Sequence, residues 1–366
     1  MNIKSINNTN FRGYDVMPLR GFYMQGLSKR GHRAVFNQMR QVANKEGLAL
    51  YLNSNNKELK MVFEPNKESL SCWAQDSLAF IKRGKSADIL WNTKQSAIPE
   101  QNLEPLANFA ICSAEKYPRG GNYYLGYNEK GERWLIINSM ELKKGDESDI
   151  KKPLEKELVE MFEVEPKNII ILDLFDNDLD ELVRPIKYPY VLVNDWEEVT
   201  ENVKRFKKEY PNVSNLYMPI EDFVSKKTSS VEEPSTEYIC NILKNYGFIP
   251  IKIAGRYHYG INYLNAIAWE NKGGKISYLT NSVKRSYKEL EFFERMFENI
   301  LRERVLNIDN MYFISGGPRT YDERNSDSAS NLYSPGFHRD NVIMDLLAAH
   351  EGGIHCLTAE IPEELF

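Results

Sequence analysis

The residue best suited to covalent chemistry is Cys356, which lies in the segment Gly352-Gly-Ile-His-Cys. A cysteine thiolate is a strong nucleophile, provided that a substrate is held close to its sulfur. The two glycines that precede it carry no side chain, so the backbone can approach a ligand closely there. Cys356 is therefore the candidate nucleophile, although an isolated cysteine is more commonly a buried apolar side chain.

The other three cysteines, Cys72, Cys112 and Cys240, are widely separated. Four cysteines in a chain of 366 residues are too few for a disulfide scaffold. They also lack the close pairs of a zinc ribbon. We expect no metal and no cofactor, and we expect Cys112 and Cys240 to be buried thiols.

Composition restricts the class of protein. Hydrophobic residues make up 42% of the chain and aromatic residues 12%, enough to bury one large core or two modest ones. The net charge is −5, with acids and bases interleaved, so nothing suggests a basic surface for nucleic acid or an anionic membrane. No stretch approaches the roughly 18 apolar residues of a membrane span, and residues 1–13 lack a signal-peptide pattern. We expect a cytoplasmic protein, with non-classical secretion left open.

The elements that must position the chemistry follow one recurring order: an extended hairpin, an amphipathic helix and a short apolar strand. Extended pairs are expected at 73–92, 122–137, 179–193 and 257–280. Helices are expected at 31–46, 149–163, 196–209 and 285–304, where apolar residues fall one turn apart. Short strands are expected at 48–52, 168–172 and 215–218. Repetition of one such unit favours a pseudosymmetric ring over independent domains.

Two polar stretches interrupt this pattern, at 225–235 and 316–336. Their composition is typical of loops near a functional rim. We therefore expect a single domain over residues 1–366 that carries two loop insertions.

Four short segments resemble, in order, the agmatine deiminase and bacterial-type peptidylarginine deiminase family of the guanidino-group-modifying (pentein) superfamily. The last of them looks like the family signature Gly-Gly-Ile-His-Cys-Ile-Thr and is the most specific. With the elements between them, the resemblance covers about residues 70–362. It implies an α/β fold, the pseudo-five-fold propeller of ββαβ-type modules (pentein fold), with a central active site. The four segments are Trp73-Ala-Gln-Asp76, Arg119-Gly-Gly-Asn122, Asn262-Tyr-Leu-Asn265 and Gly352 to Pro362.

The resemblance also implies roles for individual residues. Cys356 is expected to attack the central carbon of a guanidinium, a planar and delocalised cation. Asp76 is expected to bind that cation, and Trp73 could add an aromatic face. Asn122 and Asn265, each at the opening of a hairpin, are expected to contact the substrate.

The segment 176–184 resembles the family's Gly-His-x-Asp motif, whose histidine is the general acid and whose aspartate is the second guanidinium ligand. Asp180 matches that aspartate, but Asp178 stands where the histidine is expected. An aspartate donates a proton at pH 7 only if burial near another carboxylate raises its pKa. His258 is the alternative acid, whereas His355 is expected to pack or hydrogen-bond near the cysteine.

These residues predict a C–N hydrolase, a deiminase acting on agmatine or on free or peptidyl arginine. It would convert the guanidinium to a ureido group, with release of ammonia, through an amidino group bound to the cysteine. Two alternatives share the same site: an amidinotransferase, and a guanidine-binding or regulatory protein without turnover, which Asp178 favours. The expected partner is a cationic guanidino compound, and the sequence does not indicate an oligomeric state.

Overall fold

The computed structural model describes most of the chain that carries regular structure. The described residues are 19–25, 30–53, 78–83, 86–91, 110–113, 118, 120–142, 151–175, 177–213, 234–255, 261–282, 288–305, 307–315, 318–319, 344–345 and 353–362. All structural statements below concern these residues.

The described strands are short, from two to seven residues. They are β1 (Leu19–Gln25), β2 (Ala49–Asn53), β3 (Leu78–Arg83), β4 (Ser86–Trp91), β5 (Ala110–Ser113), β6 (Tyr123–Tyr127), β7 (Arg133–Asn138), β8 (Ile169–Leu172), β9 (Val183–Pro185), β10 (Tyr190–Asp195), β11 (Ile249–Ala254), β12 (Ile267–Glu270), β13 (Ile276–Asn281), β14 (Ile308–Ile314), β15 (Pro318–Arg319), β16 (Met344–Asp345) and β17 (Thr358–Pro362).

Helices connect the strands. They are α1 (Arg30–Glu46), α4 (Lys151–Phe162), α5 (Leu179–Leu182), α6 (Trp196–Glu209), α8 (Thr236–Asn245), α9 (Lys288–Arg304) and α11 (Ile354–Leu357). Three single turns of 3₁₀ helix are η3 (Gly120–Asn122), η4 (Ser139–Glu141) and η5 (Pro166–Asn168). None of the described helices is both long enough and apolar enough to cross a bilayer.

Five of the described sheets share one design, in which a central strand pairs antiparallel with one neighbour and parallel with the other. The parallel partner follows a crossover, as parallel strands require. The five sheets have the strand orders β17-β1-β2, β3-β4-β5, β6-β7-β8, β9-β10-β11 and β12-β13-β14. The first of them joins the two ends of the described chain, because β17 pairs with β1. The protein therefore has an α/β fold built on a repeated three-stranded unit.

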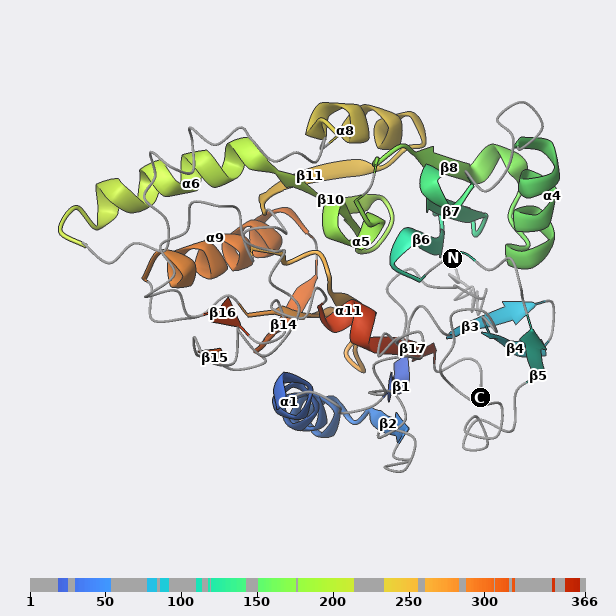
Figure 1. Ribbon diagram of the computed structural model, residues 1–366, viewed down its shortest axis with the longest axis horizontal. Coiled ribbons are helices and arrows are strands. Elements are labelled where there is room, and N and C mark those ends of the chain that lie inside the picture. The colour runs from blue at the N-terminus through green and yellow to red at the C-terminus, as the bar shows by residue number, and fades with distance from the viewer. Residues whose placement is uncertain are drawn as a thin grey trace, which may run out of the picture.

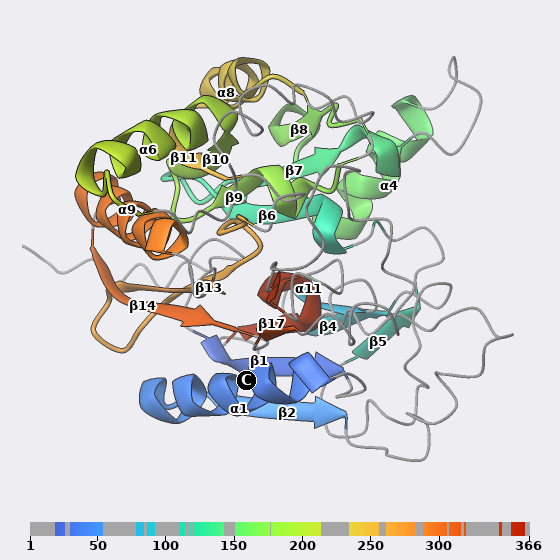
Figure 2. The same cartoon turned by 60° about the vertical axis from the view of Figure 1, so that its left-hand side comes forward.

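The helices separate into an outer and an inner set. In Figure 1, α1, α4, α6, α8 and α9 lie around the periphery, whereas α5 and α11 lie near the middle. Figure 2, turned by 60°, keeps α11 at the centre and the longer helices outside. The two short inner helices carry the residues of the candidate site.

Most of the elements predicted from the sequence are confirmed, with boundaries shifted by a few residues. Helix α6 has the predicted bounds, and Asp195 caps its N-terminus: the Asp195 carboxylate accepts a hydrogen bond from the backbone N–H of Glu197. Such an N-cap stabilises a helix by about 1 kcal/mol. The predicted extended pair at 179–193 is wrong at its start, because 179–182 form the one-turn helix α5. The strand predicted at 215–218 lies outside the described residues, as do most residues of both polar stretches. Within the second stretch the described residues 318–319 form β15, which pairs with β16.

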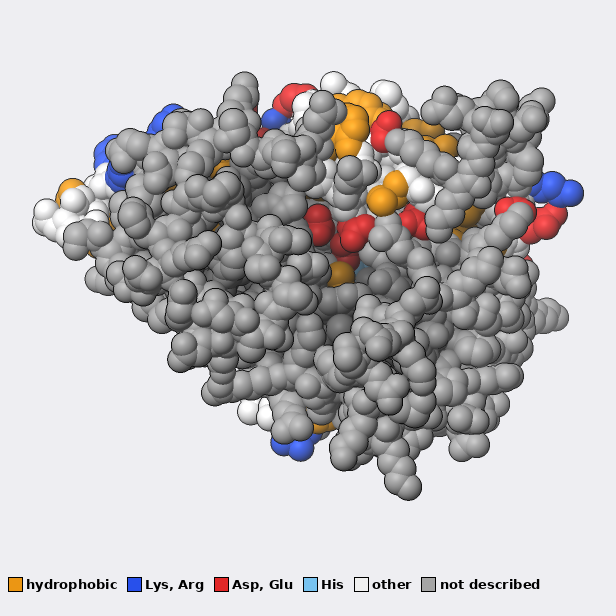
Figure 3. All heavy atoms as spheres, in the orientation of Figure 1, with side chains coloured by type: hydrophobic (Ala, Val, Ile, Leu, Met, Phe, Trp, Pro, Cys, Tyr) orange, Lys and Arg blue, Asp and Glu red, His pale blue; other side chains and the backbone are white. Residues whose placement is uncertain are grey.

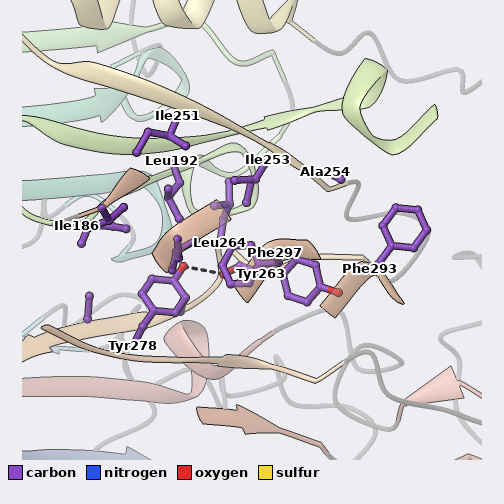
Figure 4. Close-up of a cluster of buried hydrophobic side chains, with 14 of the residues drawn as sticks. Ile186, Leu192, Ile251, Ile253, Ala254, Tyr263, Leu264, Tyr278, Phe293 and Phe297 are labelled. Atoms are coloured by element: carbon purple, nitrogen blue, oxygen red, sulfur yellow. Dashed lines mark hydrogen bonds between the residues drawn. The ribbon is translucent and has the colours of Figure 1, made fainter. Parts of the chain in front are cut away.

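The largest buried cluster packs β10, β11, β13 and α9 around the segment that precedes β12 (Figure 4). The ring of Tyr263 stacks on Phe297, with the centroids 4.5 Å apart. Its carbonyl accepts hydrogen bonds from the hydroxyls of Tyr278 and Thr280, both at 2.8 Å. Each buried aromatic side chain of this kind contributes about 1.5–3 kcal/mol. The core thereby fixes the backbone on either side of Asn265.

Candidate active site

Cys356 lies in the short helix α11 and is partly buried. The residue before this helix must be small, because a Cβ on Gly353 would lie 2.3 Å from Oδ1 of Asn265. The backbone N–H of Ile354 donates to Oδ1 of Asn281, at 3.0 Å. The backbone at Gly353 therefore makes a close approach, as the glycines predict, and the group that it approaches is the side chain of Asn265.

The amide of Asn265 contacts Cys356 through both its oxygen and its nitrogen. Its Oδ1 accepts hydrogen bonds from the backbone N–H groups of His355 (2.8 Å) and Cys356 (3.3 Å). Its Nδ2 donates to Sγ of Cys356 at 2.9 Å and to Oδ2 of Asp180 at 2.8 Å. A donor at the sulfur favours the thiolate over the thiol. Asn265 therefore fixes the position of Cys356, and its N–H acts on the sulfur against the effect of the Asp180 carboxylate, to which the same sulfur donates at 3.3 Å.

Asp180 is the acceptor on which the site converges. The residue is 1% exposed, and it comes from α5, far from α11 in the sequence. Its Oδ2 lies 3.3 Å from Sγ of Cys356 and 3.0 Å from Nδ1 of His355, besides its bond to Asn265. Because an ionised carboxylate only accepts hydrogen bonds, a shared oxygen with three donors is best suited to the charged form. This places a buried negative charge beside the sulfur.

His355 contacts both Asp180 and an aromatic ring. Its imidazole is 4% exposed and stacks on Tyr124, with the centroids 5.4 Å apart. Burial, together with the nearby Arg184 guanidinium, holds the pKa of His355 well below its usual value of 6.5. The imidazole is therefore neutral at pH 7, and Nδ1 carries the hydrogen that it donates to Asp180. The predicted packing and hydrogen-bonding role of His355 is confirmed.

The neutral His355 predicts a loss of stability in mild acid. Because the folded state holds the pKa down, the unfolded chain binds one more proton once the pH falls below about 6.5. The stability contributed by the neutral ring is present above that pH and is lost as the pH falls toward the folded pKa. Between pH 6.5 and 5.5 the free energy of unfolding should fall by about 1 kcal/mol more in the wild type than in His355→Gln. Urea titrations at the two pH values measure this difference, and equal losses in both proteins would contradict it.

Asp178 lies two residues before Asp180 and contacts Asn122. Oδ1 of Asp178 accepts from Nδ2 of Asn122 at 2.8 Å, and the same Nδ2 donates to Glu141 at 3.1 Å. Oδ1 of Asn122 accepts from the Leu179 backbone and from Asn138. Both donors and both acceptors of this amide are thus engaged. The contacts favour a positioning role for Asn122, and its predicted contact with substrate stays a prediction.

Acidic side chains gather near the middle of one face of the molecule, over α5 and β6 (Figure 3). In the described part of the chain, no His, Cys, Asp and Glu side chains form a group of three or more arranged to hold a metal ion. A surface cluster of this sign favours a cation as the ligand.

The structure brings together Cys356, Asp180 and Asn265, which come from segments 85 and 91 residues apart. Asp178 lies at the N-terminus of α5, two residues before Asp180. Three other residues predicted for the site lie outside the described residues: Trp73, Asp76 and His258. Sequence reasoning missed Asn281 and Arg184, and Arg184 is the last residue of the segment interpreted as the acid-carrying motif.

The chain is similar to known proteins in its three-dimensional structure. No protein-family model matches the chain, and no curated protein matches it. The solved structure of C. jejuni agmatine deiminase matches 96% of this chain and 96% of its own, with a TM-score of 0.58 and 12% identity. A Cys-to-Ser variant of that enzyme with substrate bound gives 0.52 and 13%, over 95% of this chain and 94% of its own. A structure designated a peptidyl-arginine deiminase gives 0.53 and 11%, over 96% and 99%.

At these identities the likeness concerns the fold, and it extends over nearly the whole of each chain. The resemblance inferred from four short sequence segments is thereby confirmed at the level of three-dimensional structure. The chain has the α/β fold of C. jejuni agmatine deiminase and of the structure designated a peptidyl-arginine deiminase.

Proposed function

We propose that this chain is a guanidine-modifying hydrolase, a deiminase with Cys356 as its nucleophile. The observation that carries the proposal is the mutual contact of the Cys356 sulfur, the Asp180 carboxylate and the Asn265 amide. A buried negative charge beside a thiolate would repel an anion and attract a cation. A guanidinium is the cation whose carbon a thiolate can attack once its charge is held by carboxylates.

In the proposed reaction, Asp180 accepts N–H bonds of the guanidinium and Cys356 attacks its central carbon. A C–S bond forms, and a proton delivered to one nitrogen lets the C–N bond break and ammonia leave. Water then adds to the amidino carbon, the C–S bond breaks, and the thiolate returns with a ureido product. Asn265 supports both halves of the cycle, because its N–H stabilises the thiolate as nucleophile and as leaving group.

The remaining assignments extend the same proposal. Asp76 is the other carboxylate that binds the guanidinium, and Trp73 is an aromatic wall of the cation pocket. The proton that ammonia needs comes from Asp178, at the position of the family's histidine, or from His258. We also propose that the five like sheets are the blades of a pseudo-five-fold propeller within one domain, which is supported by their common strand pairing. Agmatine and arginine are the substrates to test first, because the names of the structural neighbours contain them.

One observation favours a second candidate function, a guanidine-binding protein without turnover. The position expected to carry the acid has an aspartate, and Asn122 donates a hydrogen bond to it. In that contact Asp178 accepts a hydrogen bond, whereas a general acid has to donate a proton. Of the five histidines, His355 alone has a described side chain. Its imidazole is hydrogen-bonded to Asp180, and burial lowers its pKa so that it is neutral at pH 7.

Labelling with chloroacetamidine tests the proposed site. This reagent is a cation that alkylates thiolates, whereas iodoacetamide is a neutral reagent of similar size. We expect chloroacetamidine to modify Cys356 on the order of tenfold faster than any other cysteine, because the site supplies both a thiolate and a cation pocket. Cys240 is the internal control: it is 1% exposed, and burial raises the pKa of its thiol. Peptide mass mapping gives the rates. A Cys356 rate equal to the others, or no preference for the cation, would contradict the proposal.

A further inference from the structure

A buried ion pair lies behind the candidate site and is not part of the proposed reaction. Nη2 of Arg184, on β9, lies 3.1 Å from Oε1 of Glu360, on β17, and their side chains are 5% and 13% exposed. Arg184 follows Asp180 by four residues, and Glu360 follows Cys356 by four residues. The pair thus connects the two segments that carry the carboxylate and the thiol. Removing two charges from water costs several kcal/mol per ion, so its position calls for an explanation other than stability.

The ion pair reaches the site through stacked rings. The Arg184 guanidinium carbon lies 5.1 Å from the centroid of the Tyr124 ring, an attractive cation–π geometry. Tyr124 in turn stacks on His355, whose Nδ1 donates to Asp180. These contacts form one continuous series: Glu360, Arg184, Tyr124, His355, Asp180 and Cys356.

We propose that Arg184, anchored by Glu360, is a positioning residue that keeps His355 neutral and so preserves the negative charge of Asp180 for a cationic substrate. This inference rests on the proposed function, because it assigns the role that the charge of Asp180 plays there.

The surroundings of the imidazole act on its charge in opposite directions. Among the described ionisable groups, Asp180 on α5 and Tyr124 on β6 contact the ring, Arg184 on β9 lies over the ring of Tyr124, and Cys356 follows on the same helix. Asp180 favours a protonated imidazole, whereas burial opposes it most strongly and Arg184 adds to that effect. Arginine is the residue suited to this task because its guanidinium stays protonated throughout the pH range of proteins.

The state of His355 decides what Asp180 can offer. A neutral imidazole donates one hydrogen bond and leaves the carboxylate with its full negative charge. A protonated imidazole would form an ion pair with Asp180 and cancel that charge at a distance of 3.0 Å. The cation pocket would then have one attractive charge fewer.

The test is the ratio of two alkylation rates of Cys356, chloroacetamidine over iodoacetamide, measured from pH 6 to 7.5. The ratio cancels the ionisation of the thiol and reports the charge of the pocket. In the wild type we expect a flat ratio. In the double variant Arg184→Met plus Glu360→Gln, which removes both charges and keeps similar side-chain volumes, burial still lowers the pKa of His355 but the opposing cation is gone, so that pKa should rise. The ratio should then fall measurably between pH 7.5 and 6.

Three further variants isolate the charge of Arg184. Arg184→Lys and Glu360→Gln both retain a cation at position 184, so both should keep the ratio flat. Arg133→Met is the matched control, because Arg133 also lies over a tyrosine of β6, Tyr127, at 5.5 Å and pairs with Glu163 at 3.2 Å. It should leave the ratio flat as well. A role limited to holding strands together would lower stability in these variants without creating a pH dependence.

A flat ratio in the folded double variant would overturn the inference, and so would a fall of equal size in Arg133→Met. Nitrogen NMR of the wild type provides a test that needs no folded variant: the His355 ring, assigned by its loss in His355→Gln, should stay neutral down to pH 6. Protonation of that ring above pH 6 would also overturn it. If wild-type Cys356 shows no preference for the cationic reagent, the proposed function itself fails. If the wild type keeps that preference and the ratio of the double variant stays flat with pH, only the inference about Arg184 fails.

Discussion

Replacing Asp180 with asparagine is expected to reduce kcat/KM for a guanidine substrate by on the order of 10²- to 10³-fold. Asp180 is 1% exposed, and its Oδ2 accepts from three neighbouring donors. An asparagine retains one acceptor oxygen, loses the negative charge and places an N–H₂ group where a carboxylate oxygen stands. Loss of one partner in a buried charge pair typically costs 2–5 kcal/mol, and each 1.4 kcal/mol is a factor of about ten.

A matched control separates this effect from a general loss of structure. Asp195 is also buried, at 4% exposure, and it caps α6 while its Oδ2 lies 3.2 Å from Lys252. Asparagine caps helices about as well as aspartate, so Asp195→Asn should lower stability slightly and leave kcat/KM within about twofold. Steady-state kinetics on both variants, with circular dichroism to confirm folding, measures the contrast. A folded Asp180→Asn variant with wild-type kinetics would place the cation site elsewhere.

Much of the fold could be predicted because its units repeat. The apolar spacing that predicted a helix at 149–163 corresponds to α4, and the bounds predicted for α6 are those observed. Hairpins were readable from turn-rich segments between apolar runs, as at β12 and β13, whose turn contains Gly274 at a positive φ of 70°. These signals are local, so neighbouring residues in the sequence carry them.

Short elements between the repeats could not be predicted in the same way. Helix α5 has four residues, Leu179–Leu182, fewer than the two turns over which a helical period becomes visible. From the sequence, this stretch is predicted to be the start of an extended pair. This one turn nevertheless orients Asp180 toward α11, while Asp178, just before it, is directed to Asn122.

The site could be predicted as a set of residue types but not as a set of contacts. Cys356 was identifiable from its own segment, and Asp180 from the segment that carries it. The use of the Asn265 amide was not, since it spans 85 residues to Asp180 and 91 to Cys356. The pairing of Arg184 with Glu360 spans 176 residues, and nothing in either local sequence indicates it.

Cys356→Ser should abolish turnover, the second of the two largest expected effects. The hydroxyl of serine is a far weaker nucleophile than a thiolate, and the site has no base to activate it other than Asp180 among the described residues that contact position 356. We expect a loss of at least about 10³-fold in kcat. Cys240→Ser is the matched control, because Cys240 lies on the buried side of α8, in a hydrophobic cluster, and takes no part in the proposed chemistry. It should retain activity wherever it remains folded.

The most direct test of the account is a product assay on the wild type, Cys356→Ser and Cys240→Ser. Agmatine, free arginine and an arginine-containing peptide are incubated with each protein, and ammonia and the ureido product are measured by mass spectrometry. The account predicts equal amounts of ammonia and ureido product from at least one guanidine, formed by the wild type and Cys240→Ser and absent with Cys356→Ser. No product from any of the three with the folded wild type, or undiminished product with Cys356→Ser, would contradict it.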